Sequence, residues 1–93
     1  MLIQVGTRDD YEGGERTCDP LVAMWPAAAR AHTTVRYVEG ATHDFDSPGP
    51  SKNYYTKFSH AGRGGMVSVV PSPKDAAEAR QAVVNFFVKY LNP

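Results

Sequence analysis

The sequence has no excess of charge of either sign. Its 93 residues include ten lysines and arginines and ten aspartates and glutamates, which give a formal net charge of +0 at pH 7. A balanced charge provides no electrostatic reason to bind nucleic acid or an anionic membrane surface. No apolar run approaches the roughly 20 residues that a membrane-spanning helix needs. We therefore expect neither nucleic acid nor a membrane as a partner.

Cysteine is almost absent, since Cys18 is the single one. One thiol excludes a framework of internal disulfides and suits a reducing compartment. The apolar start of the chain is interrupted at once by Arg8, Asp9 and Asp10, so it does not have the pattern of a signal peptide. These observations favour a cytoplasmic location.

A recognisable catalytic nucleophile is also lacking. Neither Gly-x-Ser-x-Gly nor Gly-x-Cys-x-Gly, the sharp turns that expose such a residue, occurs in the sequence. Cys18 lies in Thr17-Cys18-Asp19 without flanking glycines, so we expect an inert thiol. The 93-residue chain on its own is therefore predicted to be inactive as a nucleophilic enzyme.

Two segments have the composition of β-strands. Residues 1–5 are apolar apart from one glutamine, and residues 33–38 are β-branched and aromatic. A run as short and apolar as the first is typical of a strand that is covered on both faces, as in a parallel sheet. The chain is long enough for one domain at most.

Helical patterns follow each of these segments. The first begins at Asp19-Pro20, with Asp19 as N-cap, although a start near residues 14–15 stays open. Its buried stripe is expected at Leu21, Trp25 and Ala28 or Ala29, and Pro26 predicts a kink or break at Trp25.

The second helical pattern begins at Ser72-Pro73, with Ser72 as N-cap, and runs to about Leu91. Its apolar stripe comprises Ala76, Ala79, Val83, Phe86, Phe87, Tyr90 and Leu91.

A long loop is expected between the second strand and the last helix. Residues 40–65 carry five glycines and two prolines without a steady period, and residues 66–70 form at most a short extended piece. Loops of this length in a compact domain are often functional. Strand, helix, strand, loop and helix form part of a βαβα winding, and two strands make too narrow a sheet to cover these apolar stripes. We infer the C-terminal portion of a larger α/β domain.

Asp9 and His43 each come just after a predicted strand. In open parallel sheets, catalytic groups and ligands gather at the carboxyl ends of the strands. An acid followed by a histidine is also the second half of the chain order nucleophile, acid, histidine of α/β-hydrolases. We therefore predict that the Asp9 and His43 side chains lie within hydrogen-bonding range, directly or through one water, with Asp10 as the alternative acid.

The segments LIQVGTRDDY at 2–11 and VEGATHDFD at 38–46, together with the closing amphipathic helix, carry a specific resemblance. The chain resembles the C-terminal part of an α/β-hydrolase of the dienelactone hydrolase family, whose fold is a parallel sheet flanked by helices. The family's Gly-x-x-Asp and Gly-Ala-x-His-x-Phe patterns match Asp9 and His43. The resemblance implies hydrolysis of a small ester or lactone by a Ser/Cys-His-Asp triad, with Asp9 as the acid, His43 as the base and no cofactor or metal.

Other interpretations of the same residues stay open. The chain is alternatively a non-catalytic module that binds another chain through an exposed sheet edge, by self-association or by pairing with a missing N-terminal part. His43, Asp44 and Asp46 form a weaker candidate for metal binding, although we expect the two aspartates to be loop carboxylates. Phe45 is expected to plug the sheet edge, and His32 and His60 are expected at the surface.

Overall fold

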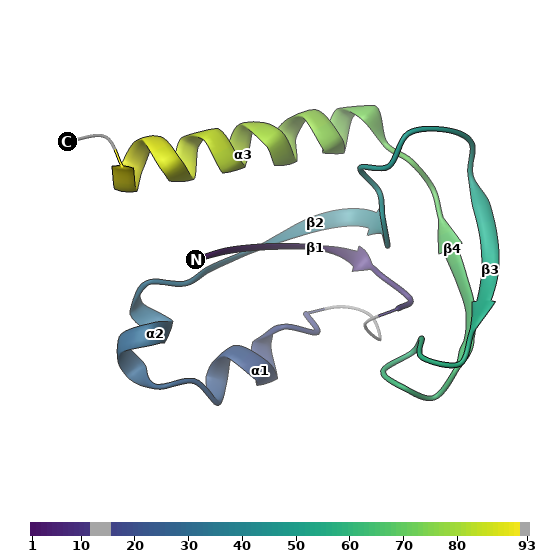
Figure 1. Cartoon of the computed structure of the whole chain (residues 1–93), viewed down its shortest axis with the longest axis horizontal. Helices are drawn as coiled ribbons and strands as arrows, with labels where there is room; N and C mark the ends of the chain where they lie inside the picture. Colours follow the sequence, from purple (N-terminus) through teal and green to yellow (C-terminus); the bar gives the residue numbers. More distant parts are fainter. Residues whose placement is uncertain (12–15, 92–93) are drawn as a thin grey trace.

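A computed structural model describes residues 1–11 and 16–91 of the chain (Figure 1). Within these residues the protein is a small mixed α/β chain with two two-stranded sheets and three helices. The elements are β1 (Leu2–Arg8), α1 (Asp19–Ala23), α2 (Ala27–Ala31), β2 (Thr34–Thr42), β3 (Lys52–Thr56), β4 (Gly65–Val69) and α3 (Pro73–Leu91). None of the helices in the described ranges is long and apolar enough to cross a membrane.

The two predicted strands pair in parallel, as β1 and β2. Their register is regular from Leu2 opposite Thr34 to Gly6 opposite Val38, and then shifts so that Arg8 lies opposite Thr42. The shift adds two residues to β2, and Gly40 provides the positive φ of 76° within this bulge. Both strands therefore continue beyond the ends predicted from the sequence, because the bulge lets them pair again.

The predicted break in the first helix is confirmed. α1 ends at Ala23 and α2 begins at Ala27, with Pro26 in an extended conformation between them. The N-cap of α1 is Cys18, so Asp19 is the first helical residue and its predicted capping role is wrong. The alternative start near residues 14–15 lies outside the described residues.

The predicted buried stripe of this segment is wrong. Leu21 is 53% exposed, Trp25 is half-buried, and neither α1 nor α2 has a buried residue. The two helices have five residues each. The sheet beside them has only two strands and is too narrow to cover them. Polar contacts hold α1 against β2 instead, since the Tyr37 hydroxyl donates a 2.6 Å hydrogen bond to Asp19 Oδ1. This bond lowers the pKa of Asp19, and burial raises the pKa of Tyr37.

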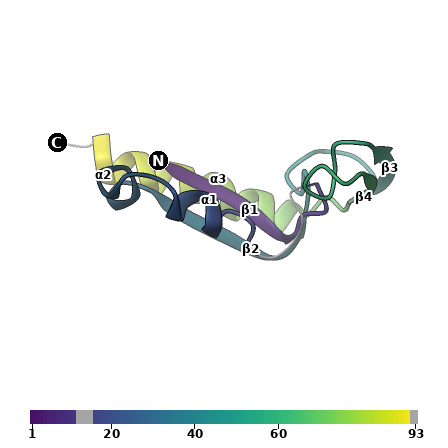
Figure 2. The ribbon, with the colours of Figure 1, turned by 90° about the horizontal axis from the view of Figure 1, so that it is seen from below.

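Part of the predicted long loop is a β-hairpin. β3 and β4 pair antiparallel, with Lys52 opposite Val69 and Thr56 opposite Gly65. The prediction of a loop over residues 52–56 is wrong, whereas the extended piece expected at 66–70 is confirmed as β4. The strand 52–56 has no apolar alternation of its own, and the buried apolar residues of the hairpin, Val67 and Val69, lie in its partner strand. Figure 2 shows the hairpin at one end of the molecule, away from α2.

The last helix begins as predicted, because Ser72 Oγ accepts the backbone N–H of Asp75 at 3.3 Å. Only Ala76 and Ala79 of its predicted apolar stripe are buried. Farther along, Phe87 is 51% exposed and Leu91 is 70% exposed. α3 lies beside β1 and β2 (Figure 1), but the two-stranded sheet covers only the first turns of its apolar face.

Candidate active site

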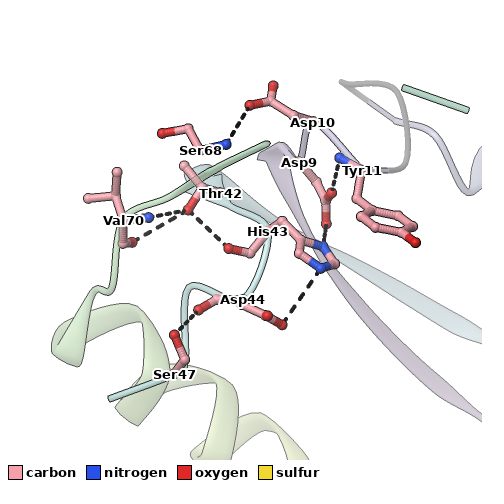
Figure 3. Close-up of polar contacts among 9 residues, drawn as sticks. All are labelled: Asp9, Asp10, Tyr11, Thr42, His43, Asp44, Ser47, Ser68 and Val70. Atoms are coloured by element: carbon pink, nitrogen blue, oxygen red, sulfur yellow. Dashed lines mark hydrogen bonds and ion pairs between the residues drawn. The ribbon is translucent and has the colours of Figure 1, made fainter. Parts of the chain in front are cut away.

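The parallel pairing brings Asp9 and His43 together. Asp9 follows β1 directly, His43 follows β2 directly, and the carboxyl ends of the two strands lie at the same edge of the sheet. Asp9 Oδ2 is 3.1 Å from His43 Nδ1 (Figure 3). The contact that the sequence predicted between these two side chains is therefore confirmed.

A close approach of the two backbones makes this contact geometrically accessible. A Cβ atom added to Gly6 would lie 2.1 Å from the carbonyl oxygen of Ala41, so no other residue fits at this position. Beyond it, the Gly40 N–H donates to Thr7 Oγ1 at 2.8 Å, and the Asp9 N–H donates to the Gly6 carbonyl at 3.2 Å. The ends of β1 and β2 are thus held together just before Asp9 and His43.

Asp9 is buried, with 6% of the residue exposed, and both of its carboxylate oxygens have hydrogen-bond partners. Oδ1 accepts the backbone N–H of Tyr11 at 2.9 Å, and Oδ2 faces His43 Nδ1. An ionised carboxylate only accepts, so His43 Nδ1 carries the proton in this contact. In a neutral imidazole the proton on Nδ1 leaves a lone pair on Nε2, which is the state that a general base requires.

His43 lines a hollow of about 240 Å³. Gln4, Gly6, Asp9, Asp44 and Phe45 are among the residues that line it. Asp44 Oδ1 lies 3.8 Å from Nε2, beyond hydrogen-bond length but close enough to attract an imidazolium. A reacting group therefore has room next to His43, and the Asp44 carboxylate lies near Nε2.

Two tyrosines lie near this pair. The ring of Tyr11 stacks on the His43 imidazole, with ring centroids 4.9 Å apart and planes inclined by 19°. Burial raises the pKa of the Tyr54 phenol, and the charge of Asp44 raises it further. The hairpin therefore brings an aromatic hydroxyl within electrostatic range of the site.

Asp10, the alternative acid, has a different role. Its Oδ2 accepts the backbone N–H of Ser68 at 3.2 Å, and its carbonyl accepts the N–H of His60 at 2.9 Å. Asp10 thus ties the turn after β1 to the hairpin, and Asp9 is the acid that contacts His43.

Sequence reasoning missed Tyr11 and Thr42. Thr42 is 6% exposed, and its Oγ1 accepts the N–H of Val70 at 2.9 Å, so it joins the end of β2 to the residue that follows β4. Its position next to His43 could not reveal this role, because the bond depends on where the chain runs after β4. Tyr11 comes two residues after Asp9, the spacing of a turn in which an aspartate accepts a backbone N–H, and this spacing was a usable signal.

The remaining candidates do not join the site. No three of the described histidine, cysteine and acidic side chains are arranged to hold a metal ion, so the alternative of a metal site at His43, Asp44 and Asp46 is not supported. Phe45 is buried in the small core with Val38 and Ala79, as expected of a residue that plugs the sheet edge. His32 is exposed as predicted.

His60 was also expected at the surface, but it is half-buried. Its Nε2 is 2.8 Å from the carbonyl oxygen of Met66.

No protein-family model, no curated protein and no solved structure matches this chain. The functional argument therefore depends on the geometry of the chain itself. That geometry is a hydrogen-bonded aspartate and histidine at the carboxyl edge of a parallel strand pair, and both residues line an open hollow.

Proposed function

We propose that this chain is the C-terminal part of an α/β-hydrolase domain similar to the dienelactone hydrolases. It contributes the acid, Asp9, and the base, His43, of a Ser/Cys-His-Asp triad that hydrolyses a small ester or lactone. The observation that carries the proposal is the 3.1 Å contact between Asp9 Oδ2 and His43 Nδ1, at the ends of adjacent parallel strands and in the chain order acid, then histidine.

In this function each residue has a defined step. His43 Nε2 accepts the proton of a serine hydroxyl or cysteine thiol as that group attacks the ester carbonyl. Asp9 holds Nδ1–H, which fixes the tautomer, and stabilises the imidazolium that forms. The imidazolium then gives its proton to the leaving alkoxide, and a water molecule is activated in the same way to release the acid product.

The state of the sheet supports a larger domain. Among the described residues, β1 and β2 pair only with each other, so the outer edge of each strand is unpaired. Large apolar side chains next to these strands and along α3 are exposed, among them Met1 at 58% and Phe87 at 51%. A wider sheet that carries the nucleophile would pair with an unpaired strand edge and cover these side chains, which is why we assign the nucleophile to another segment.

A second candidate function is that of a non-catalytic module that binds another chain. The unpaired edges of the β1–β2 sheet favour it, because an exposed edge presents backbone groups to a further strand. This candidate explains the unpaired edges but gives no role to the contact between Asp9 and His43. The test below separates the two.

The test joins this chain to the segment encoded directly upstream and measures hydrolysis of an activated aryl ester. The proposal expects that segment to contain a strand, a Gly-x-Ser-x-Gly or Gly-x-Cys-x-Gly turn and a helix, and it expects saturable turnover by the joined protein. His43→Gln should lower kcat by about 10³-fold or more, because the base is lost. His32→Gln, an exposed histidine outside the site, is the matched control. If the two segments bind each other tightly but the joined protein hydrolyses the ester at the same background rate with and without His43, the result would instead favour the binding module.

A further inference from the structure

Tyr11 contacts both members of the Asp9–His43 pair. Its backbone N–H donates to Asp9 Oδ1 at 2.9 Å, and its ring lies nearly parallel to the His43 imidazole at 4.9 Å between centroids. Figure 3 shows the ring beside the imidazole, while the Asp9 carboxylate lies between the Tyr11 backbone and Nδ1. One residue thus orients the acid through its main chain and covers one face of the base with its side chain.

The hairpin holds Tyr11 in this place. The carbonyl of Tyr11 accepts the N–H of Ala61 at 3.3 Å, and the preceding residue, Asp10, accepts the backbone N–H groups of His60 and Ser68. These three bonds join the turn after β1 to both ends of the β3–β4 hairpin. The position of the Tyr11 backbone is therefore set by the fold and does not depend on His43 itself.

A histidine that is held at Nδ1 alone can lose this one contact when its ring rotates about the Cβ–Cγ bond. The 3.1 Å contact with Asp9 fixes one nitrogen, and the 3.8 Å separation from Asp44 is too long to fix the other. An aromatic ring stacked on one face restricts this rotation, because a turned imidazole would collide with it or lose the stacking contact. Restriction of the rotation keeps Nδ1 in contact with Asp9 and leaves Nε2 free of that contact.

We infer that Tyr11 is a positioning residue that holds His43 in the orientation in which its bond to Asp9 fixes the tautomer of a general base. This inference rests on the proposed function, in which His43 is that base. The part of Tyr11 that acts is the ring and not the hydroxyl, since the contact is a stack of ring faces. Tyr11→Phe should therefore keep the effect, and Tyr11→Leu should lose it.

The test is NMR of the 93-residue chain with ¹⁵N-labelled histidine, which distinguishes a protonated Nδ1 from a protonated Nε2. Wild-type His43 should be the Nδ1–H tautomer. His60 is an internal control with the opposite tautomer, because its Nε2 is 2.8 Å from the Met66 carbonyl, which can only accept a hydrogen bond. His32→Gln simplifies the assignment.

In Tyr11→Leu we expect the His43 signals to move to the average of both tautomers while the His60 signals stay unchanged. In Tyr11→Phe the signals of His43 and of His60 should both match those of the wild type. Three results would overturn the inference: a wild-type His43 that is already averaged, a Tyr11→Leu variant that keeps the pure Nδ1–H tautomer, or a loss of the His60 signature along with that of His43. The last result would show that Tyr11 only maintains the fold.

The same readout separates this inference from the proposed function. The tautomer of His43 is measured without a substrate or a nucleophile, so absence of hydrolysis by the joined protein leaves the NMR result unaffected. If hydrolysis is present, Tyr11→Leu should lower kcat by about 10- to 100-fold with KM unchanged, because the base is misplaced while binding is kept. A change in KM alone would assign Tyr11 to substrate contact and overturn the positioning role.

Discussion

At the scale of single residues, two neighbouring aspartates have different partners: Asp9 contacts His43, and Asp10 accepts hydrogen bonds from the hairpin. Asp9 and His43 could be identified because each directly follows a strand, and parallel strands place such residues at one edge. The different roles of Asp9 and Asp10 depend on the hairpin, since Ser68 and His60 bind Asp10 from a distant part of the chain. No local pattern contains that information.

Tyr54 gives a prediction on pH dependence. Burial and the charge of Asp44 raise the pKa of its phenol above the ordinary value of about 10. Above that pH the unfolded chain loses the proton while the folded chain keeps it, so the free energy of unfolding should fall as the pH rises from about 10 toward the raised pKa. Tyr54→Phe should make this fall smaller in urea titrations at alkaline pH.

The control for this prediction is Tyr55→Phe, on the same strand but 68% exposed. An alkaline fall that is identical in Tyr54→Phe and the wild type would show that the Tyr54 phenol ionises equally easily in both states.

At the scale of elements, local signals predicted the boundaries that proline and serine set. The break at Pro26 and the cap at Ser72 depend on residues within one helical turn. The hairpin could not be predicted in this way, because Lys52–Thr56 becomes a strand only through pairing with Gly65–Val69. Likewise, the bulge at Gly40 becomes necessary only when β2 pairs with β1.

The close approach of β1 and β2 at Gly6 gives a prediction on stability. Gly6→Ala would place a methyl group 2.1 Å from the Ala41 carbonyl oxygen, so the two strands must separate. We expect the free energy of unfolding to fall by about 3 kcal/mol or more, as for a severe case of overpacking, and the contact between Asp9 and His43 to be lost. Urea denaturation and the NMR signature of His43 measure the two effects.

Gly49→Ala is the matched control for this change. No atom lies within 4 Å of the added methyl group there, and only the strain of its φ of 99° remains, worth about 1–2 kcal/mol. If Gly6→Ala proves no more damaging than Gly49→Ala, the close approach does not organise the site.

At the scale of the whole molecule, the chain is more extended than a compact domain of its length. Its radius of gyration is 14.6 Å, whereas a compact domain of 93 residues has about 12 Å. The buried core is correspondingly small, and Val83, Phe87 and Leu91 of α3 remain exposed. The sequence predicted this deficit, because the apolar stripe of the last helix is wider than a sheet of two strands can cover.

We therefore expect the isolated chain to self-associate through these apolar surfaces. Each large apolar side chain left in water forgoes about 1.5–3 kcal/mol, and a half-dozen of them equal the net stability of a small domain. The midpoint of thermal unfolding should rise with protein concentration. A sharp transition of a monomer, independent of concentration, would show that 93 residues form a complete domain.

The most direct test of the central claim, that Asp9 and His43 act as one acid and base pair, is a double-mutant cycle on hydrolysis by the joined protein. Residues that act as a unit in catalysis have strongly non-additive effects. The account predicts that Asp9→Asn and His43→Gln each lower kcat by orders of magnitude, and that the double variant is no slower than His43→Gln alone. Losses that multiply in the double variant, or an Asp9→Asn variant with full activity, would contradict it.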